Sequence, residues 1–190
     1  MESVLTDKQG KHLLQLARQT IAQRLSVAPE TPVTQGDDPD AECGTFVTLN
    51  INGALRGCIG NLTAAGSVTE SVRRNAVSAA FQDSRFSPLS AEELAEVEIE
   101  ISVLSPPQKL EYSDGDDLIR KLRPGIDGVI LRLGGTGATF LPQVWEQLPD
   151  PELFLGHLCR KAGLTASAWR DSHPEIEIYQ VQSFTEEEEQ

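Results

Sequence analysis

The residue types best suited to chemistry occur in the sequence LRGCIG at residues 55–60, where an arginine and a cysteine stand two positions apart. Residues two apart in a β-strand lie on the same face, separated by roughly 6.6 Å. The cation of Arg56 would then stabilise the thiolate of Cys58, which is how cysteine nucleophiles are activated. Gly57 and Gly60 would leave the backbone uncovered for a ligand. The alternative interpretation is a buried structural cysteine in a central strand, with glycines that serve close packing.

A second charged pair follows in the sequence FQDSRF at residues 81–86. Asp83 and Arg85 stand near the expected end of a helix, and Arg85 is a candidate second anion-binding group beside Arg56. Guanidinium groups bind carboxylates and phosphates through two parallel hydrogen bonds. A structural ion pair between Asp83 and Arg85, or a helix cap, is the alternative.

Two further candidate ligand contacts occur later in the chain. Gln143 follows a proline in LPQV, and Lys161 lies two residues before Gly163, which is expected to end a helix. Either side chain could donate a hydrogen bond to a ligand. The helix dipole also favours a lysine at such a position, so Lys161 has a structural explanation as well.

The histidines and cysteines do not have the spacing of a metal site. His157 and Cys159 stand two apart in an expected helix and would lie on different faces. The glycine-rich residues 133–137 lack the strand-then-helix context of a phosphate-binding loop and are better explained as a hairpin turn. The sequence therefore predicts no metal site, and no cofactor is evident.

The strand that carries LRGCIG is expected to be half of a β-hairpin over residues 44–60. Asn52 and Gly53 form the strongest short hairpin signal, and β-rich segments flank them. A two-residue turn at this point predicts that Cys58 lies opposite Val47. Because both faces carry apolar residues, both strands are expected to be central in their sheet.

Helices and further strands surround this hairpin. Capping boxes that begin at Thr6, Ser67 and Ser90 predict three helices, and strict alternation over 97–104 predicts a strand with one wet face. A smaller unit is expected over 108–148, with a helix near 114–122 and a second hairpin, and a further helix follows over 150–163. The last strand, 175–184, alternates until Tyr179, where its phase slips, through a bulge or a misreading of the pattern. This order predicts an α+β fold, not a doubly wound sheet.

Composition narrows the class of protein. The chain has 190 residues and a net charge of −13, from 29 acidic and 16 basic residues, which disfavours sequence-independent binding to nucleic acid. No apolar run approaches the ~20 residues of a membrane helix, and the first residues lack the features of a secretory signal. Three cysteines without a paired spacing favour a reducing compartment, so we expect a cytoplasmic protein. The acidic run near the C-terminus is expected to be a solvated tail over 185–190.

Six segments in order resemble the AMMECR domain family, in the bacterial and archaeal form called AmmeMemoRadiSam system protein A. The segments are GTFVTL with LRGCIG (44–60), AAFQDSRF (79–86), EISVLSPP (100–107), PGIDGVIL (124–131), FLPQVW (140–145) and LCRKAGL (158–164). The resemblance implies a single domain over 1–190 with a central, largely antiparallel sheet flanked by helices. It also implies two lobes with the motif lining a cleft between them, which we assign to 1–107 plus 149–184 and to 108–148. The name of the AmmeMemoRadiSam system associates this form of the family with a radical SAM protein and a Memo-like protein, so the resemblance implies these two partners.

Two functions are consistent with these residues. In the first, an accessory enzyme uses Cys58 as nucleophile and Arg56 as activator to modify or carry a small anionic group. The residues Gly57, Gly60, Asp83, Arg85, Gln143 and Lys161 would then contact the ligand. In the second, the same site is a non-catalytic module that binds a ligand or a partner protein. The sequence does not specify a substrate, a general base or an oligomeric state.

Overall fold

The computed structural model describes residues 5–27, 38–39 and 41–186, and the chain divides into two compact units. Unit 1 comprises residues 1–105 and 182–190, and unit 2 comprises residues 106–181. Residues 149–181, which we assigned to the larger lobe, thus belong to unit 2, because the helices α4 (Pro151–Lys161) and α5 (Ala168–Asp171) share a core with the hairpin of that unit. Residues 26–42, which the prolines and acidic residues of the sequence predict to be a surface loop, lie mostly outside the described residues.

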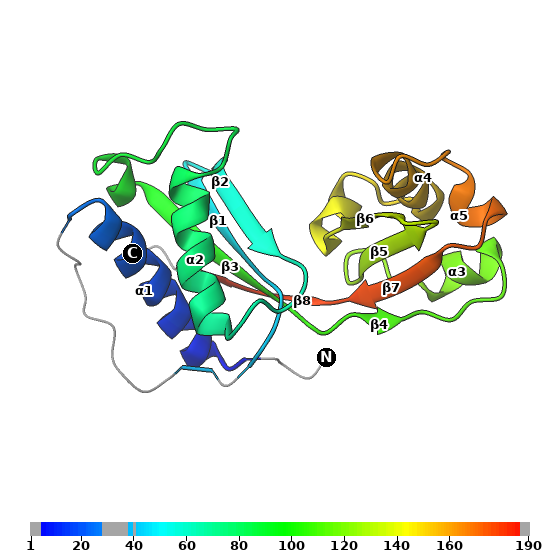
Figure 1. The fold of residues 1–190 in the computed structure, drawn as a ribbon, viewed down its shortest axis with the longest axis horizontal. Helices are drawn as coiled ribbons and strands as arrows, with labels where there is room; N and C mark the ends of the chain where they lie inside the picture. Colours follow the sequence, from blue (N-terminus) through cyan, green and yellow to red (C-terminus); the bar gives the residue numbers. More distant parts are fainter. Residues whose placement is uncertain (1–4, 28–37, 40, 187–190) are drawn as a thin grey trace. The chain divides into compact units, whose positions relative to one another are not determined.

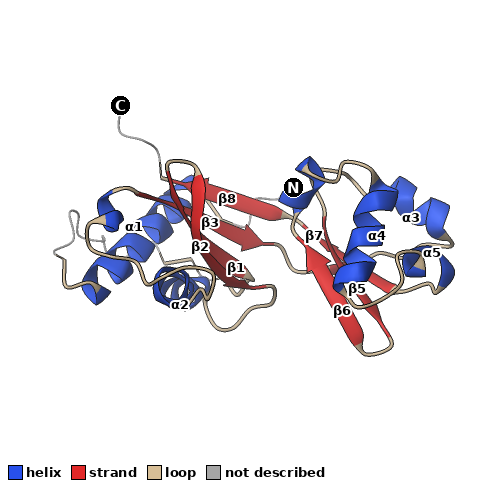
Figure 2. Cartoon of the chain, turned by 90° about the horizontal axis from the view of Figure 1, so that it is seen from above, coloured by secondary structure: helices blue, strands red, loops and turns tan. Residues whose placement is uncertain are grey.

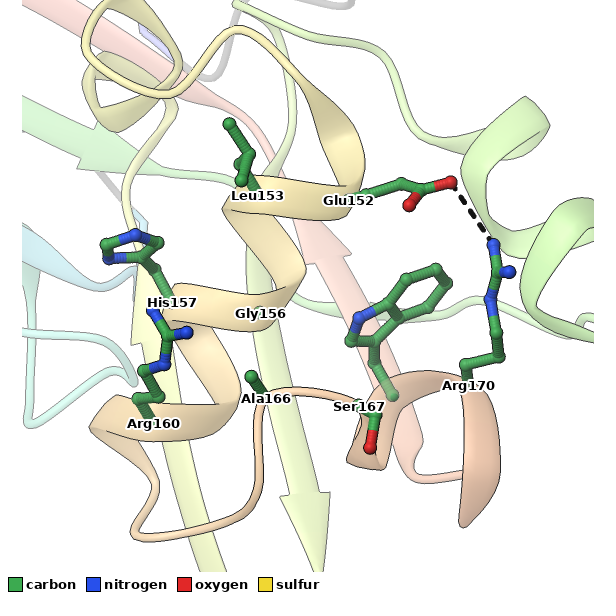
Figure 3. A pocket seen from close by; sticks show the side chains of 9 residues that line it. Glu152, Leu153, Gly156, His157, Arg160, Ala166, Ser167 and Arg170 are labelled. Atoms are coloured by element: carbon green, nitrogen blue, oxygen red, sulfur yellow. Dashed lines mark hydrogen bonds and ion pairs between the residues drawn. The ribbon is translucent and has the colours of Figure 1, made fainter.

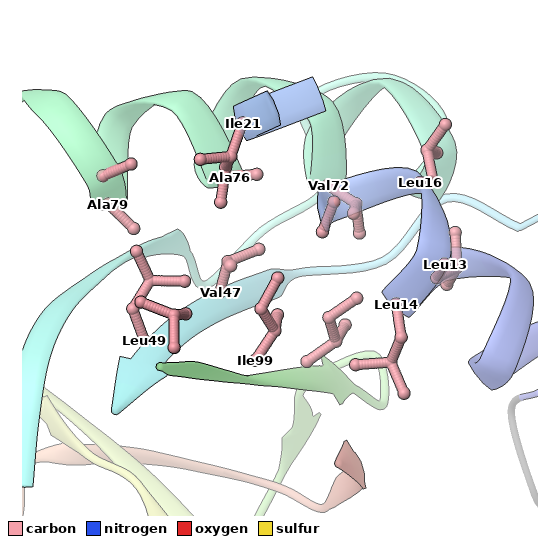
Figure 4. Packing of buried hydrophobic residues seen from close by; sticks show 14 of the residues in the cluster. Leu13, Leu14, Leu16, Ile21, Val47, Leu49, Val72, Ala76, Ala79 and Ile99 are labelled. Carbon is pink, nitrogen blue, oxygen red and sulfur yellow. The ribbon is translucent and has the colours of Figure 1, made fainter. Parts of the chain in front are cut away.

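Unit 1 is a four-stranded sheet with two helices packed on one face (Figures 1 and 2). The strands have the order β2-β1-β3-β8. Their bounds, with those of the helices, are α1 Asp7–Arg24, β1 Thr45–Ile51, β2 Ala54–Asn61, α2 Val68–Phe81, the short 3-10 helix η1 Glu93–Ala95, β3 Val97–Leu104 and β8 Val181–Thr185. Leucine, valine and isoleucine side chains of α1 and α2 meet those of β1 and β3 in the core (Figure 4).

Two of the three predicted helix starts of unit 1 are confirmed by their capping interactions. Thr6 and Gln9 form a reciprocal capping box at α1, and Ser67 and Glu70 form another at α2. The third start differs from the prediction: Ser90 and Glu93 exchange the hydrogen bonds of a capping box, but the 3-10 helix η1 begins only at Glu93 and has one short turn. Local sequence thus sets where these helices begin, and burial of one apolar face holds them on the sheet.

The hairpin forms as predicted, but its register and position differ from the prediction. Ile51 faces Ala54 across the turn, yet a β-bulge then leaves Arg56 without a direct partner on β1. Every later pairing moves by one residue, so Cys58 lies opposite Thr48 and not opposite Val47. The prediction that both strands are central was also wrong for β2, which forms an edge of the sheet.

Unit 2 is a second four-stranded sheet, with the order β4-β7-β5-β6 and helices on one face (Figure 2). The elements are β4 Gln108–Lys109, α3 Gly115–Lys121, β5 Gly128–Leu133, β6 Thr136–Phe140, the 3-10 helix η2 Pro142–Glu146, α4 Pro151–Lys161, α5 Ala168–Asp171 and β7 Glu175–Tyr179. Asp150 caps α4, and Gly163 follows that helix with a φ of 78°, both as the sequence predicts. The rings of Trp145 and Phe154 stack in the core, with centroids 3.7 Å apart.

The phase slip near Tyr179 has a simple structural explanation. The predicted last strand is two strands, β7 and β8, separated by Gln180 and belonging to different sheets. The expected acidic tail also begins later than residue 185. Glu186 lies against unit 1, where its carboxylate accepts hydrogen bonds from the Arg18 side chain and from the Ile99 N–H. Residues 187–190 lie outside the described part of the chain.

The α+β class is confirmed by these helices and antiparallel sheets. Within the part of the chain that the structure describes, no helix combines the length and hydropathy required to cross a membrane.

Candidate functional site

The LRGCIG sequence forms most of β2, the edge strand of unit 1, and the bulge at Arg56 decides which way its side chains point. Directly opposed residues of neighbouring strands share a face of the sheet. Gly57 is paired with Leu49 on the face that the helices cover, and Cys58 is paired with Thr48 on the other face. The bulge therefore interrupts the alternation that was expected to place Arg56 beside Cys58.

Cys58 is half-buried, and the hydroxyl of Thr48 donates a hydrogen bond to its Sγ atom over 3.2 Å. The two backbone polar groups of Cys58 both point to the open edge of β2, where they meet side chains from the turn that follows α2. The Thr48–Cys58 pair is consequently of the non-hydrogen-bonded kind, in which opposed side chains approach each other most closely. The thiol thus accepts its hydrogen bond from a neutral hydroxyl, and the Arg85 guanidinium lies close enough to interact with Cys58 electrostatically.

Asp83 and Arg85 form a clasp over this strand edge, which we call the Asp83–Arg85 clasp. The Cys58 N–H donates to Asp83 Oδ2 at 2.9 Å, and Arg85 Nη2 donates to the Cys58 carbonyl at 3.3 Å. Arg85 also donates to Asp83 from Nε at 2.9 Å and from Nη2 at 2.6 Å. The two side chains therefore satisfy backbone groups that an edge strand otherwise exposes.

The electrostatics of the clasp follow from this geometry. The side chain of Asp83 is only 4% exposed, and that of Arg85 is 53% exposed. Hydrogen bonds from the Arg85 guanidinium, followed by the one from the Cys58 N–H, hold the pKa of Asp83 well below its usual range. The hydrogen bonds that Arg85 donates to Asp83 raise the pKa of Arg85. Asp83 is accordingly a buried carboxylate whose charge is matched by a guanidinium that remains open to solvent on one side.

Arg56, at the bulge, is engaged by a different carboxylate. Its Nε and Nη2 donate to the two oxygens of Glu93 in η1, at 2.8 and 3.0 Å. The Arg56 side chain is 13% exposed, and its hydrogen bonds with Glu93 raise the pKa of the guanidinium while lowering that of the carboxyl. The ring of Phe86 lies within cation–π distance of both guanidiniums, 5.9 Å from Arg56 and 5.4 Å from Arg85.

The two glycines of the motif have close neighbours within unit 1. A Cβ atom at Gly57 would lie 2.2 Å from the Ala79 carbonyl oxygen of α2, and one at Gly60 would lie 2.3 Å from the Phe46 ring. Real Cβ atoms do not approach other atoms this closely. Packing is therefore a sufficient reason for glycine at both positions. The packing explanation that the sequence left open therefore accounts for these two residues.

Gln143 and Lys161 lie in unit 2, whereas the other predicted site residues lie in unit 1. Gln143 is an exposed residue of η2. Lys161 ends α4, donates to the Thr139 carbonyl at 3.0 Å and has its ammonium 5.1 Å from the Phe140 ring centroid. In unit 1 the structure brings together Arg56, Gly57, Cys58, Gly60, Asp83 and Arg85.

Three participants were not foreseen as site residues: Thr48, Phe86 and Glu93. Thr48 depends on the bulge, for which the sequence carries no clear signal. Glu93 is the acidic member of the capping box that begins at Ser90, and its second role with Arg56 requires a contact between segments far apart in sequence. Among the described residues no group of three or more histidine, cysteine or acidic side chains could hold a metal ion.

Fold and site together define a two-unit α+β protein in which LRGCIG forms a clasped sheet edge. The AMMECR1 family model matches residues 14–184, so the chain belongs to the AMMECR1 family. A protein from Methanothermobacter thermautotrophicus is 35% identical over 187 residues, covering 96% of this chain and 97% of its own. A Methanopyrus kandleri protein is 37% identical over 199 residues, covering 99% and 93%. The crystal structure of PH0010 from Pyrococcus horikoshii superimposes with a TM-score of 0.84 at 34% identity, covering 97% of this chain and 95% of that one.

Proposed function

We propose that this chain is a non-catalytic accessory protein in which Arg85, held at the LRGCIG strand, binds an anionic group of a partner. The observation that carries the proposal is the state of Arg85. Three hydrogen bonds to Asp83 and Cys58 fix its guanidinium, yet its side chain is 53% exposed. A guanidinium that is ordered before binding loses little conformational entropy when it meets a carboxylate or phosphate.

The arrangement of charges favours binding over nucleophilic catalysis. An activated cysteine requires a nearby cation or base that is available to its sulfur. Arg56 is instead paired with Glu93 through two hydrogen bonds, and Arg85 is paired with Asp83. The polar contact of the Cys58 sulfur is the Thr48 hydroxyl.

The family resemblance supports the choice of partners, and the cysteines support the location. The partners we propose are a radical SAM protein and a Memo-like protein, in the cytoplasm. Three free cysteines, of which Cys43 and Cys159 are buried, support a reducing compartment.

Binding of the purified candidate partners, measured by calorimetry, tests this proposal. We expect Arg85→Gln to weaken binding by about tenfold or more, since a charge-assisted hydrogen bond is lost. Arg85→Lys keeps the positive charge but loses the two parallel hydrogen bonds of the guanidinium, so it should weaken binding less than Arg85→Gln does. Arg73→Gln, at an exposed arginine of α2, is the matched control and should have little effect. Binding that survives both changes at Arg85 would refute the proposal.

A second candidate function, covalent chemistry at Cys58, has one supporting observation. The Thr48 hydroxyl donates a hydrogen bond to Sγ and so orients the sulfur at this position. The rate of alkylation of Cys58 against pH, in a chain with Cys43 and Cys159 replaced by alanine, separates the two functions. A rate that stays high below the ordinary thiol range, together with loss of function in Cys58→Ser, would favour the enzyme. Slow alkylation, with partner binding kept in Cys58→Ser, would favour the accessory protein.

A further inference from the structure

A groove in unit 2 lies between α4 and the segment that leads into α5 (Figure 3). Its volume is about 350 Å³, at the small end of the range for ligand sites. Figure 3 shows the side chains of His157 and Arg160 at one end and the Glu152–Arg170 ion pair at the other. Every residue that lines the groove belongs to unit 2.

The charges of the groove are not balanced. Arg170 donates to Glu152 at 3.2 Å and to Asp116 at 3.3 Å, and its guanidinium lies 4.8 Å from the Trp169 ring centroid. The charge of the Glu152 carboxylate is therefore matched by Arg170 at the same end of the groove. Among the residues that the structure describes, Arg160 has no ion-pair partner although the chain carries a net charge of −13. One end of the groove thus presents a guanidinium whose charge is uncompensated.

The floor of the groove is open because of one residue. Gly156 is buried in the middle of α4, where glycine is less favourable than alanine. A Cβ atom at this position would lie 3.5 Å from the Ala166 carbonyl oxygen, which is an ordinary contact. Unlike Gly57, this glycine is not required by packing. Its effect is to leave space at the floor of the groove.

The walls are suited to an apolar body. Leu153 is 57% exposed, an unusual state for a large apolar side chain, and it lines the groove together with Ala166 and Trp169. An apolar or aromatic group could cover these side chains while an attached anion reached the guanidinium.

We propose that this groove binds a small organic oxyanion, a carboxylate or phosphate monoester on an aromatic or aliphatic body, with Arg160 as its principal anion contact. His157, on the same turn of α4, lies beside the anion, and Gly156 accommodates the body of the ligand. The site is independent of the function proposed for the LRGCIG strand, so either can fail without the other.

Titration of the labelled full-length chain with benzoate and phenyl phosphate, followed by two-dimensional NMR, tests the inference. We expect saturable shifts at the Gly156 and Ala166 amides and at the Trp169 indole. The Trp145 indole, which donates to the Asp127 carbonyl in the core, should not move. Benzyl alcohol, which has the ring without the charge, should bind at least about tenfold more weakly.

Three variants complete the test. Arg160→Gln should lower the affinity for the anionic probes by about tenfold or more. Gly156→Ala should lower it by about tenfold while the chain remains folded, because the added methyl occupies the floor. Arg120→Gln removes the same charge at an exposed position on α3 and should leave the affinity unchanged.

The inference is overturned if no saturable shift appears with either probe, or if Arg120→Gln weakens binding as much as Arg160→Gln does. In that case Arg160 serves only to complement the dipole at the end of α4.

Discussion

Replacement of Asp83 by asparagine tests whether the Asp83–Arg85 clasp holds the LRGCIG strand in place. Each carboxylate oxygen accepts from two donors. Oδ1 accepts from the Arg85 N–H and Nε, and Oδ2 accepts from the Cys58 N–H and Arg85 Nη2. Asparagine has nearly the same shape but replaces one oxygen by an NH₂ group. In either orientation of the amide, this group faces two donors and can accept from neither.

The expected cost follows from these lost contacts. A buried hydrogen bond to a charged group contributes about 1.5–3 kcal/mol, and two are lost. Arg85 is half exposed, so water replaces part of what its guanidinium loses. We therefore expect Asp83→Asn to lower the free energy of unfolding of unit 1 by about 2–4 kcal/mol at pH 7.

The pH dependence of this difference has a definite sign. The pKa of Asp83 is lower in the folded chain than in the unfolded chain. The carboxylate thus contributes stability above the unfolded value of about 3.9, and this contribution is lost as the pH falls further through the folded value. The difference between wild type and Asp83→Asn should stay constant from pH 7 to pH 5 and decrease below about pH 4.

Two signals separate the units in a urea titration. Both tryptophans, Trp145 and Trp169, lie in unit 2, so their fluorescence reports that unit, whereas far-UV circular dichroism also reports α1 and α2. Asp83→Asn should shift the circular dichroism transition. Glu96→Gln removes one charge at an exposed site of unit 1 and is the matched control. A shift below about 0.5 kcal/mol, or an equal shift in the control, would refute the reasoning.

Three further predictions concern unit 1. Gly57→Ala should destabilise it by about 2–3 kcal/mol in urea denaturation, because the methyl collides with a carbonyl of α2; unchanged stability would contradict the packing role of this glycine. Glu93→Gln should cost about 0.5–1.5 kcal/mol at pH 7 and progressively less below about pH 4.3, since hydrogen bonds from Arg56 lower the pKa of Glu93; a cost independent of pH would exclude the ion pair as its source. Glu186→Gln should cost about 1 kcal/mol, measured by thermal unfolding, and an unchanged melting temperature would show that Glu186 belongs to the solvated tail.

Local signals were sufficient to predict the helices. Thr6 and Ser67 begin helices where the sequence places them, because a capping box depends on residues three apart and on nothing distant. The hairpin turn at Asn52 and Gly53 is local in the same way. Elements that depend only on residues close together in the sequence could thus be predicted without a structure.

The chemistry of the site was less predictable because it depends on one extra residue in a strand. The cysteine and both arginines were identified, but their proposed neighbourhood assumed regular alternation through Arg56. The bulge turns Cys58 toward Thr48 and directs Arg56 to Glu93. A bulge depends on how a strand fits its neighbours in the fold, here α2 beside Gly57 and η1 beside Arg56, and a pattern of residue types does not contain those contacts.

The last strand shows how a broken pattern can carry information about the division of the chain. Alternation over 175–179 places Ile176 in the core of unit 2, and after Gln180 a second phase places Phe184 against α1 of unit 1. A bulge would shift the phase within one sheet, whereas here the two segments pair in different sheets, and Tyr179 at the end of β7 is already buried on the face opposite Ile176. The slip therefore marks the point at which the chain leaves one core and joins another. Because a side chain added at Gly10 would collide with the Phe184 ring, the second phase is fixed by packing on α1 and not by the preceding strand.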